Sequence, residues 1–235
     1  MRLLLRVLIV ILGMTSSLQA QDTRQLFDQA NELYQQGNFQ EAAVCYEELA
    51  KVYPSANVYY NLGNAYYRQG KLGYAILNFE RARRLAPRDQ DIRYNLDYVR
   101  SLVPETSRWE LGHIFGFFTP RELQVLLLVC YMIFLPLALL TRIRTRFMKT
   151  ALAVLGVLIL LSAVGLVYET ESPPKGVVVI DETKAHFEPG LLGTVHFVLP
   201  EGAFVSIQKQ REDWCLIQRQ DRKRGWIPID CLQRL

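Results

Sequence analysis

Residues 59–87 read YYNLGNAYYRQGKLGYAILNFERARRLAP, and this stretch decides the fold of the N-terminal part of the chain. Small side chains at Gly63 and Ala75 allow two successive helices to approach closely, and the large rings of Tyr66 and Phe79 fill the space beside them. A proline closes the stretch and prevents the second helix from continuing, because its ring clashes with the preceding turn. The stretch therefore predicts a helix–turn–helix unit.

The pattern of this unit occurs twice in the chain. Residues 37–43 (GNFQEAA) recur as residues 70–76 (GKLGYAI), and the same offset of 33 residues carries Pro54 onto Pro87. A helix, a turn, a helix and a closing proline with a period of about 34 residues resemble the tetratricopeptide repeat. We therefore predict an all-α repeat module over residues 21–103, with repeats at about 23–55 and 56–89 and a capping helix at 90–103.

The first helix of each repeat in such an array lines a concave surface that binds partners. The candidate partner-binding residues on this surface are Asn31, Tyr34, Asn57, Tyr60, Asn64, Tyr67 and Arg68. The alternative is that the tyrosines only flank the core and the asparagines are ordinary solvated side chains. Asn31, Asn61 and Asn95 are similar to the asparagines of repeats that clamp a C-terminal carboxylate. Phe27 stands where those clamps have lysine, so we expect no carboxylate clamp.

Two apolar runs, Leu123–Leu140 and Thr150–Tyr168, flank a short basic stretch at residues 142–149. Each run approaches the length of about 20 apolar residues that a helix needs to cross a bilayer core. We therefore predict transmembrane helices over 123–141 and 150–168, joined by a cytoplasmic loop because basic loops stay inside. This hairpin predicts a multi-pass protein of the bacterial inner membrane with both flanking modules on the periplasmic side.

Three short segments precede or connect these parts. Arg2 and Arg6, followed by an apolar core, predict a signal peptide over residues 1–20, with an uncleaved anchor as the alternative. Residues 104–122 hold four large aromatic side chains and are predicted as an interfacial bridge at the headgroup level. Packing of this bridge beneath the repeat module remains an alternative. Residues 169–175 are predicted as a tether.

The hydrophobic period changes to two after the tether. Short runs of β-forming residues, separated by turn residues, predict a small all-β barrel over residues 176–235. The predicted strands cover Val177–Ile180, Val195–Leu199, Phe204–Ile207, Trp214–Ile217 and Gly225–Pro228. The order of glycines, tryptophans and apolar residues here resembles bacterial SH3-like domains. In that resemblance Trp214 and Trp226 are tentative partner-binding residues of a peptide groove, or else part of the framework.

The sequence offers no set of residues for catalysis, for a cofactor or for a metal. Its three histidines are far apart, and it contains no Gly-rich phosphate loop and no CxxC motif. The formal net charge of +4 arises from the signal and the membrane-flanking segments, so no basic face suits nucleic acid. Cys215 and Cys231 either form a disulfide in an oxidising compartment or remain thiols. We expect a protein that is not an enzyme.

The order of the parts, from signal through repeats, aromatic bridge and basic-loop hairpin to SH3-like domain, resembles the BatE-type proteins of bacterial aerotolerance operons. Residues 59–67 (YYNLGNAYY) and 91–96 (DIRYNL) look much like the repeats of that family. The resemblance implies a scaffold that works beside membrane-anchored von Willebrand factor A proteins and a MoxR-type AAA+ ATPase in a stress system. The alternative function is a cell-wall-binding or sensing protein whose SH3-like domain holds peptidoglycan peptides.

Overall fold

The computed structural model describes residues 21–103, 122, 125–126, 128–133, 150, 153–161, 173–190 and 193–235. One compact unit combines Met1–Arg108 with Pro174–Leu235, and the intervening Trp109–Pro173 form a second unit. The helical repeats and the β-strands therefore belong to the same unit. The predicted signal peptide, the predicted cytoplasmic loop and nearly all of the predicted aromatic bridge lie outside the described residues.

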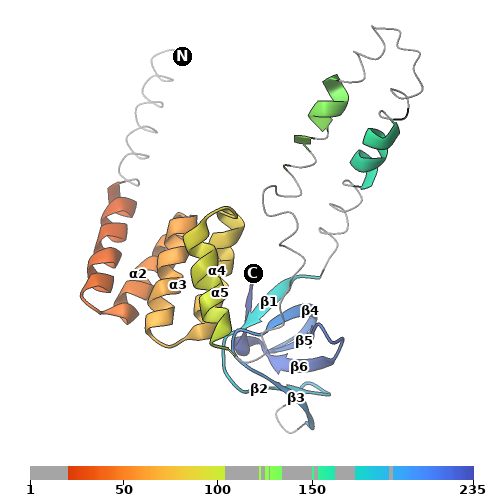
Figure 1. The fold of residues 1–235 in the computed structure, drawn as a ribbon. Helices are drawn as coiled ribbons and strands as arrows, with labels where there is room; N and C mark the ends of the chain where they lie inside the picture. The colour runs from red at the N-terminus through yellow and green to blue at the C-terminus, as the bar shows by residue number, and fades with distance from the viewer. Residues whose placement is uncertain are drawn as a thin grey trace, which may run out of the picture. The chain divides into compact units, whose positions relative to one another are not determined.

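The N-terminal part consists of α-helices that pack one after another. A first helix covers residues 21–35, and the following helices are α2 (Phe39–Val52), α3 (Ala56–Arg68), α4 (Leu72–Leu85) and α5 (Gln90–Ser101). Each of α2 to α5 contacts the next along the chain, so they lie side by side (Figure 1). Gly37 and Gly70 have φ angles of +84° and +77° in the turns within the two repeats, which is why glycine recurs at that position.

Small and large side chains interlock between α3 and α4 as the sequence predicts. A Cβ atom added at Gly63 would lie 2.8 Å from the ring of Phe79, so only glycine fits against that ring. Phe79 is itself buried, as are Tyr46 of the first repeat and Ala75 of the second. The close approach of these helices holds their exposed faces in fixed positions, and one of those faces lines the candidate site.

The C-terminal part is a seven-stranded antiparallel sheet with the order β3-β2-β6-β5-β4-β1-β7. Its strands are β1 (Lys175–Val178), β2 (Thr183–His186), β3 (Val195–Leu199), β4 (Phe204–Arg211), β5 (Trp214–Gln218), β6 (Arg224–Pro228) and β7 (Leu232–Arg234). A short 3-10 helix, η2 (Ile229–Cys231), precedes β7. The strand predicted over Val195–Leu199 has the same bounds as β3, whereas β2 was not among the predicted strands.

The predicted closed barrel is wrong. Strands β3 and β7 stand at opposite ends of the strand order, and each has a neighbour on one side only. Closure would require the two end strands to pair, but β7 has only three residues. The sheet is therefore open, and the β3 edge carries no further strand among the described residues.

The predicted transmembrane hairpin is also wrong. Within the part of the chain that the structure describes, no helix is both long enough and apolar enough to cross a bilayer. The described helical residues in the two apolar runs are 125–126, 128–133, 150 and 153–161.

The sheet has a hydrophobic core of its own and also contributes two side chains to the core of the repeats. Val177 of β1 and Phe204 of β4 pack in the same buried cluster as the repeat side chains. Gly73 of α4 approaches the sheet so closely that an added Cβ would lie 2.7 Å from the carbonyl oxygen of Val178. The Gly73 N–H also donates a hydrogen bond of 2.9 Å to Glu201 Oε2. The sheet thus buries one face of the second repeat.

Candidate functional site

A small open hollow marks the concave side of the helices. It is lined by Asn31, Tyr34, Gln35, Tyr46, Asn61 and Asn64, and its volume is about 90 Å³. Small-molecule pockets span about 300–1,000 Å³ and enclose most of their ligand. This hollow is far below that range and open, so it suits one side chain of a peptide better than a whole small molecule. Three of the predicted groove residues, Asn31, Tyr34 and Asn64, line it together.

Asparagine side chains join the first repeat to the second at the base of this hollow. The Oδ1 atom of Asn31 accepts a 2.7 Å hydrogen bond from the Tyr46 hydroxyl and a 3.3 Å bond from Asn61 Nδ2. Burial raises the pKa of Tyr46 to about 12, so this hydroxyl keeps its proton and remains a donor at neutral pH. The Asn31 side chain is therefore held in one orientation before any partner arrives.

A second asparagine joins α5 to α3 in the same way. Asn95 Nδ2 donates to the Tyr60 hydroxyl at 2.8 Å and to Asn64 Oδ1 at 3.2 Å. The Tyr60 ring also contacts the buried Phe79 ring, with 5.8 Å between the centroids. Predicted site residues Tyr60 and Asn64 thus take part in the packing of the array, as the alternative in the sequence analysis holds, while each remains partly exposed.

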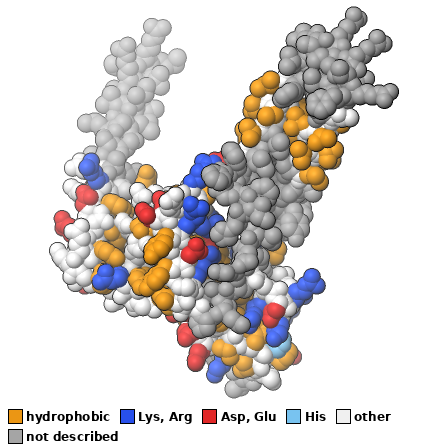
Figure 2. Space-filling model, viewed as in Figure 1, with side chains coloured by type: hydrophobic (Ala, Val, Ile, Leu, Met, Phe, Trp, Pro, Cys, Tyr) orange, Lys and Arg blue, Asp and Glu red, His pale blue; other side chains and the backbone are white. Residues whose placement is uncertain are grey.

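Tyrosines continue this surface onto α5. The rings of Tyr67 and Tyr98 meet edge to face with centroids 5.9 Å apart, and their hydroxyls are 3.5 Å apart. Tyr98 is 46% exposed, and Tyr94, one helical turn earlier, is 72% exposed. Figure 2 shows hydrophobic side chains, a class that includes tyrosine, gathered over the helical part between scattered charges. We call Tyr60, Tyr67, Tyr94 and Tyr98 the tyrosine strip.

Sequence reasoning missed two members of this strip. Tyr94 and Tyr98 lie on the helix that was predicted only as a cap. The signal was present, because Tyr60-Asn61-Leu62 recurs as Tyr94-Asn95-Leu96 and so places Tyr94 at the position of Tyr60. Extending the groove pattern to α5 would have found both residues, since the same helix face recurs every three or four residues.

The remaining predicted groove residues, Arg68 and Asn57, lie at the two ends of α3. The Arg68 guanidinium stands 4.4 Å from the centroid of the Phe39 ring, and Tyr34 meets that ring edge to face at 5.1 Å. The Arg68 side chain therefore packs on Phe39, next to the turn of the first repeat. Asn57 is exposed in the first turn of α3.

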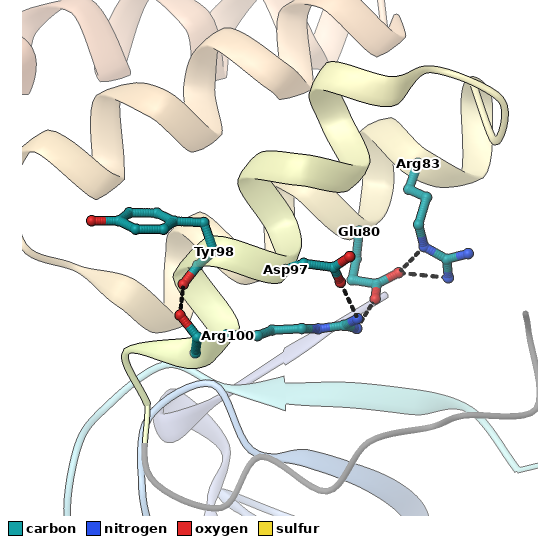
Figure 3. Close-up of polar contacts among 6 residues, drawn as sticks. Glu80, Arg83, Asp97, Tyr98 and Arg100 are labelled. Atoms are coloured by element: carbon teal, nitrogen blue, oxygen red, sulfur yellow. Dashed lines mark hydrogen bonds and ion pairs between the residues drawn. The ribbon is translucent and has the colours of Figure 1, made fainter.

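A buried ion network lies on the side of α4 and α5 that faces the sheet (Figure 3). Glu80 is buried and accepts hydrogen bonds from Arg83 at 2.8 Å and from Arg100. Asp97 lies 4.0 Å from Arg100, whose guanidinium stands 5.0 Å from the centroid of the Phe204 ring. Burial lowers the pKa of Arg100, although the Glu80 charge opposes that shift. Each charge here has a partner, so the network serves to join three elements of the fold.

The two tryptophans of the predicted peptide groove both contact His186. Trp214 meets the His186 ring edge to face at 5.6 Å, and Trp226 pairs with His186 across β2 and β6. Trp226 is only 9% exposed, and the Arg211 guanidinium stands 5.7 Å from its centroid. Little of the Trp226 ring is left for a ligand.

The described ranges contain neither a candidate metal centre nor a disulfide. No group of three or more His, Cys, Asp or Glu side chains there could hold a metal ion. Cys215 and Cys231 are free thiols, and burial raises the pKa of each, which makes them less reactive.

Comparison with known proteins gives one family. Residues 27–90 match the tetratricopeptide repeat family, a range that begins in the first helix and ends at the start of α5. No curated protein matches the chain. The crystal structure of yeast Tom70 is similar at 14% sequence identity and a TM-score of 0.33, covering 65% of this chain and 26% of that one. This chain thus spans about a quarter of the length of Tom70, and such a low TM-score says nothing about a shared function.

Proposed function

We propose that this protein is a non-enzymatic adaptor whose helical repeats bind a segment of a partner protein along the tyrosine strip. The observation that carries this proposal is the pair of Tyr67 and Tyr98, which lie on different helices yet form one partly exposed aromatic surface. Tyrosine is enriched among the interface residues that contribute most to binding. Tetratricopeptide repeats are modules for protein–protein interaction, and the family match covers α2 and α3, which includes Tyr67.

The chemistry of the surface points to an uncharged segment. Its accessible side chains are mainly asparagine amides and tyrosine phenols, and Arg68 is engaged with Phe39. An amide both donates and accepts hydrogen bonds, so Asn64 and Asn57 suit the main chain of a peptide. Tyrosine rings suit its apolar side chains. Because no charge pair dominates, the affinity should depend only weakly on salt.

The resemblance to BatE-type proteins supports a choice of partners. We propose that the segment belongs to a von Willebrand factor A protein or a MoxR-type ATPase system of bacterial stress responses, met on the periplasmic side as the signal-like start implies. Support for this choice comes from the residues 59–67 and 91–96 that carry the resemblance. These residues include most of the tyrosine strip.

The test is a comparison of tyrosine variants of the full chain. Crosslinking in native cells followed by mass spectrometry identifies the bound proteins, and the affinity for each purified candidate is then measured. The double variant Tyr67→Ala/Tyr98→Ala should lose about 2 kcal/mol or more of binding free energy, which is roughly 30-fold in Kd. Tyr53→Ala is the matched control, since Tyr53 is 59% exposed beyond the end of α2 and outside the strip.

Two outcomes would contradict the proposal. The first is unchanged partner retention by the double variant while circular dichroism shows an intact fold. The second is an equal loss in Tyr53→Ala, which would place the interface elsewhere. Saturable binding of purified peptidoglycan in place of any protein would favour the cell-wall alternative.

A further inference from the structure

The hollow on the concave side of the repeats is lined only by side chains that are polar and uncharged. The lining residues are Asn31, Tyr34, Gln35, Tyr46, Asn61 and Asn64. Each carries an amide or a phenol, and both of these groups can donate and accept hydrogen bonds. A group that fills this hollow should therefore be polar, and its hydrogen bonds, its size and its charge can be derived from the lining.

Two of the lining amides are oriented by the fold so that their N–H groups remain available. Asn31 Oδ1 accepts from the Tyr46 hydroxyl and from Asn61 Nδ2, and Asn64 Oδ1 accepts from Asn95 Nδ2. Neither Asn31 Nδ2 nor Asn64 Nδ2 donates to another residue in the described part of the chain. Because a side-chain amide has two N–H donors, both residues can donate to a ligand at the hollow.

Acceptor groups line the same hollow. Asn61 uses its Nδ2 toward Asn31, and its Oδ1 accepts no hydrogen bond from the described residues. Gln35 is exposed, and its amide supplies a further donor and a further acceptor. An occupant that both donates and accepts therefore satisfies the lining better than one that only accepts or only donates.

The volume of the hollow corresponds to a small polar group. The hollow measures about 90 Å³. One water molecule takes up about 30 Å³ in the liquid, so about three water molecules fill the hollow. The carboxamide that ends an Asn or Gln side chain consists of a carbon, an oxygen and a nitrogen atom, and it can replace those water molecules.

A carboxylate or an ammonium group is a poorer match for this hollow. A charged group that leaves water needs an opposite charge beside it, and the lining residues provide none. The first helix, α3 and α5 form the concave surface, and they carry acids and bases in nearly equal number. The acids are Asp22, Asp28, Glu32, Asp91 and Asp97, and the bases are Arg24, Arg68, Arg93 and Arg100. The surroundings thus favour neither sign, and a neutral occupant is preferred.

We propose that the hollow binds the carboxamide side chain of an Asn or Gln residue in the partner segment. The carboxamide oxygen accepts from Asn31 Nδ2 and Asn64 Nδ2, and the carboxamide N–H groups donate to Asn61 Oδ1. This inference rests on the proposed function, because it names the side chain that the segment places beside the tyrosine strip. Asn64 lies one helical turn from Tyr60 and from Tyr67, so one segment can contact the hollow and the strip together.

Blocked peptides that differ at one residue test this selection. The probes are acetyl-Ala-Leu-Xaa-Leu-Ala-amide with Gln, Asn, Glu or Met at Xaa. Each is titrated into the isotope-labelled full chain while NMR follows the side-chain NH₂ signals of Asn31 and Asn64. The better of the two carboxamide peptides should shift these signals and bind at least about tenfold more tightly than the Glu and Met peptides. Equal affinities, or tighter binding of the Glu or the Met peptide, overturn the proposal.

Substitution by Asp tests the orientation of the amides, because Asp keeps the shape and the oxygen of Asn but lacks its N–H donors. Asn31→Asp retains the acceptor for Tyr46 and Asn61, so it should fold normally and bind the carboxamide peptide at least about tenfold more weakly. Asn61→Asp removes the donor to Asn31 and should lower Tm by about 3 °C or more. Asn38→Asp is the matched control, since Asn38 is exposed and lies outside the hollow, and it should change neither value. An equal drop in Tm for Asn31→Asp and Asn61→Asp overturns the orientation and with it the proposal.

The tyrosine variants separate this proposal from the proposed function. If Tyr67→Ala/Tyr98→Ala loses the partner while the four peptides bind alike, the carboxamide proposal fails and the adaptor surface stands. Selective binding of a carboxamide peptide together with full partner retention by the double variant would instead contradict the proposed function.

Discussion

The guanidinium of Arg100 on α5 lies over the Phe204 ring of β4, with 5.0 Å between the guanidinium carbon and the ring centroid. The same guanidinium donates to Glu80 on α4, which is buried. One side chain therefore joins two repeat helices to a strand that lies more than a hundred residues further along the chain. The helical repeats and the sheet depend on each other at this point, although each was predicted as a separate module.

Removal of Glu80 should destabilise the protein strongly. Glu80→Ala leaves the Arg100 guanidinium partly buried without its main partner, and breaking a buried pair in this way costs about 3–5 kcal/mol. Urea unfolding followed by circular dichroism measures the loss. Asp97→Ala is the control, since Asp97 is exposed at 4.0 Å from Arg100 and should cost less than about 1 kcal/mol. Equal losses in the two variants would mean that Glu80 is not the essential partner.

Two adjacent tyrosines should respond differently to truncation. Tyr66 is buried, stacks on Tyr74 at 4.9 Å and donates to Glu47, so Tyr66→Ala should cost about 3–5 kcal/mol and unfold the repeats. Tyr67 is only partly buried at the margin of the core and meets the exposed Tyr98 edge to face, so Tyr67→Ala should leave the fold intact. Thermal melts by circular dichroism compare the two. A similar drop in Tm for both would place Tyr67 in the core.

The closest approach of helix and sheet should not tolerate one added methyl group. Gly73→Ala would place a Cβ 2.7 Å from the Val178 carbonyl oxygen and 2.9 Å from the Val179 Cα, and both are backbone atoms. Overpacking of this kind costs about 1–3 kcal/mol. The control is Gly156→Ala, where no described atom lies within 4 Å of the added Cβ. Denaturant midpoints test both variants, and an unchanged midpoint for Gly73→Ala would show that α4 and β1 can separate at no cost.

Alkaline pH should destabilise the first repeat through Tyr46. An unfolded tyrosine loses its proton near pH 10, whereas burial raises the pKa of Tyr46 to about 12 in the folded chain. Between these values the unfolded state binds fewer protons, so the free energy of unfolding falls as pH rises from about 10 to about 12. The contribution is fully present below about pH 10. Urea unfolding across this range should show a smaller pH slope for Tyr46→Phe and an unchanged slope for Tyr53→Phe.

The repeats could be predicted because their signals are local. Gly63 and Phe79 fit each other in neighbouring helices, and their spacing in the sequence is enough to find the pair. The groove residues Asn31 and Asn64 follow from the repeat position in the same way. Their hydrogen bonds to Tyr46, Asn61 and Asn95 could not be predicted, because the pattern gives the helix face of a residue but not its side-chain partners.

The sheet was harder to predict because its signals are not local. Strand β2 has the sequence Thr-Lys-Ala-His, which shows no apolar alternation, and it is a strand because β3 and β6 pair with it. Whether a sheet closes depends on its end strands, and the sequence does not show that Arg81 occupies a carbonyl of β7. Gly73 contacts Val178, and Phe204 contacts Arg100. In each pair a repeat residue meets a sheet residue about a hundred positions further along the sequence. Contacts between segments that are distant in sequence leave no periodic pattern.

The compact unit of repeats and sheet is interrupted by residues 109–173, which form a unit of their own. The chain leaves the unit after α5 and returns at β1, and side chains such as Arg100 and Glu201 tie the two halves together without covalent help. A single proteolytic cut within the interruption therefore separates the polypeptide into two fragments but not the folded body. The fragments should co-elute in gel filtration and part only in denaturant. Two separately expressed fragments, 21–103 and 173–235, should associate on mixing and form the folded unit. The chain could therefore be used as a pair of complementing fragments.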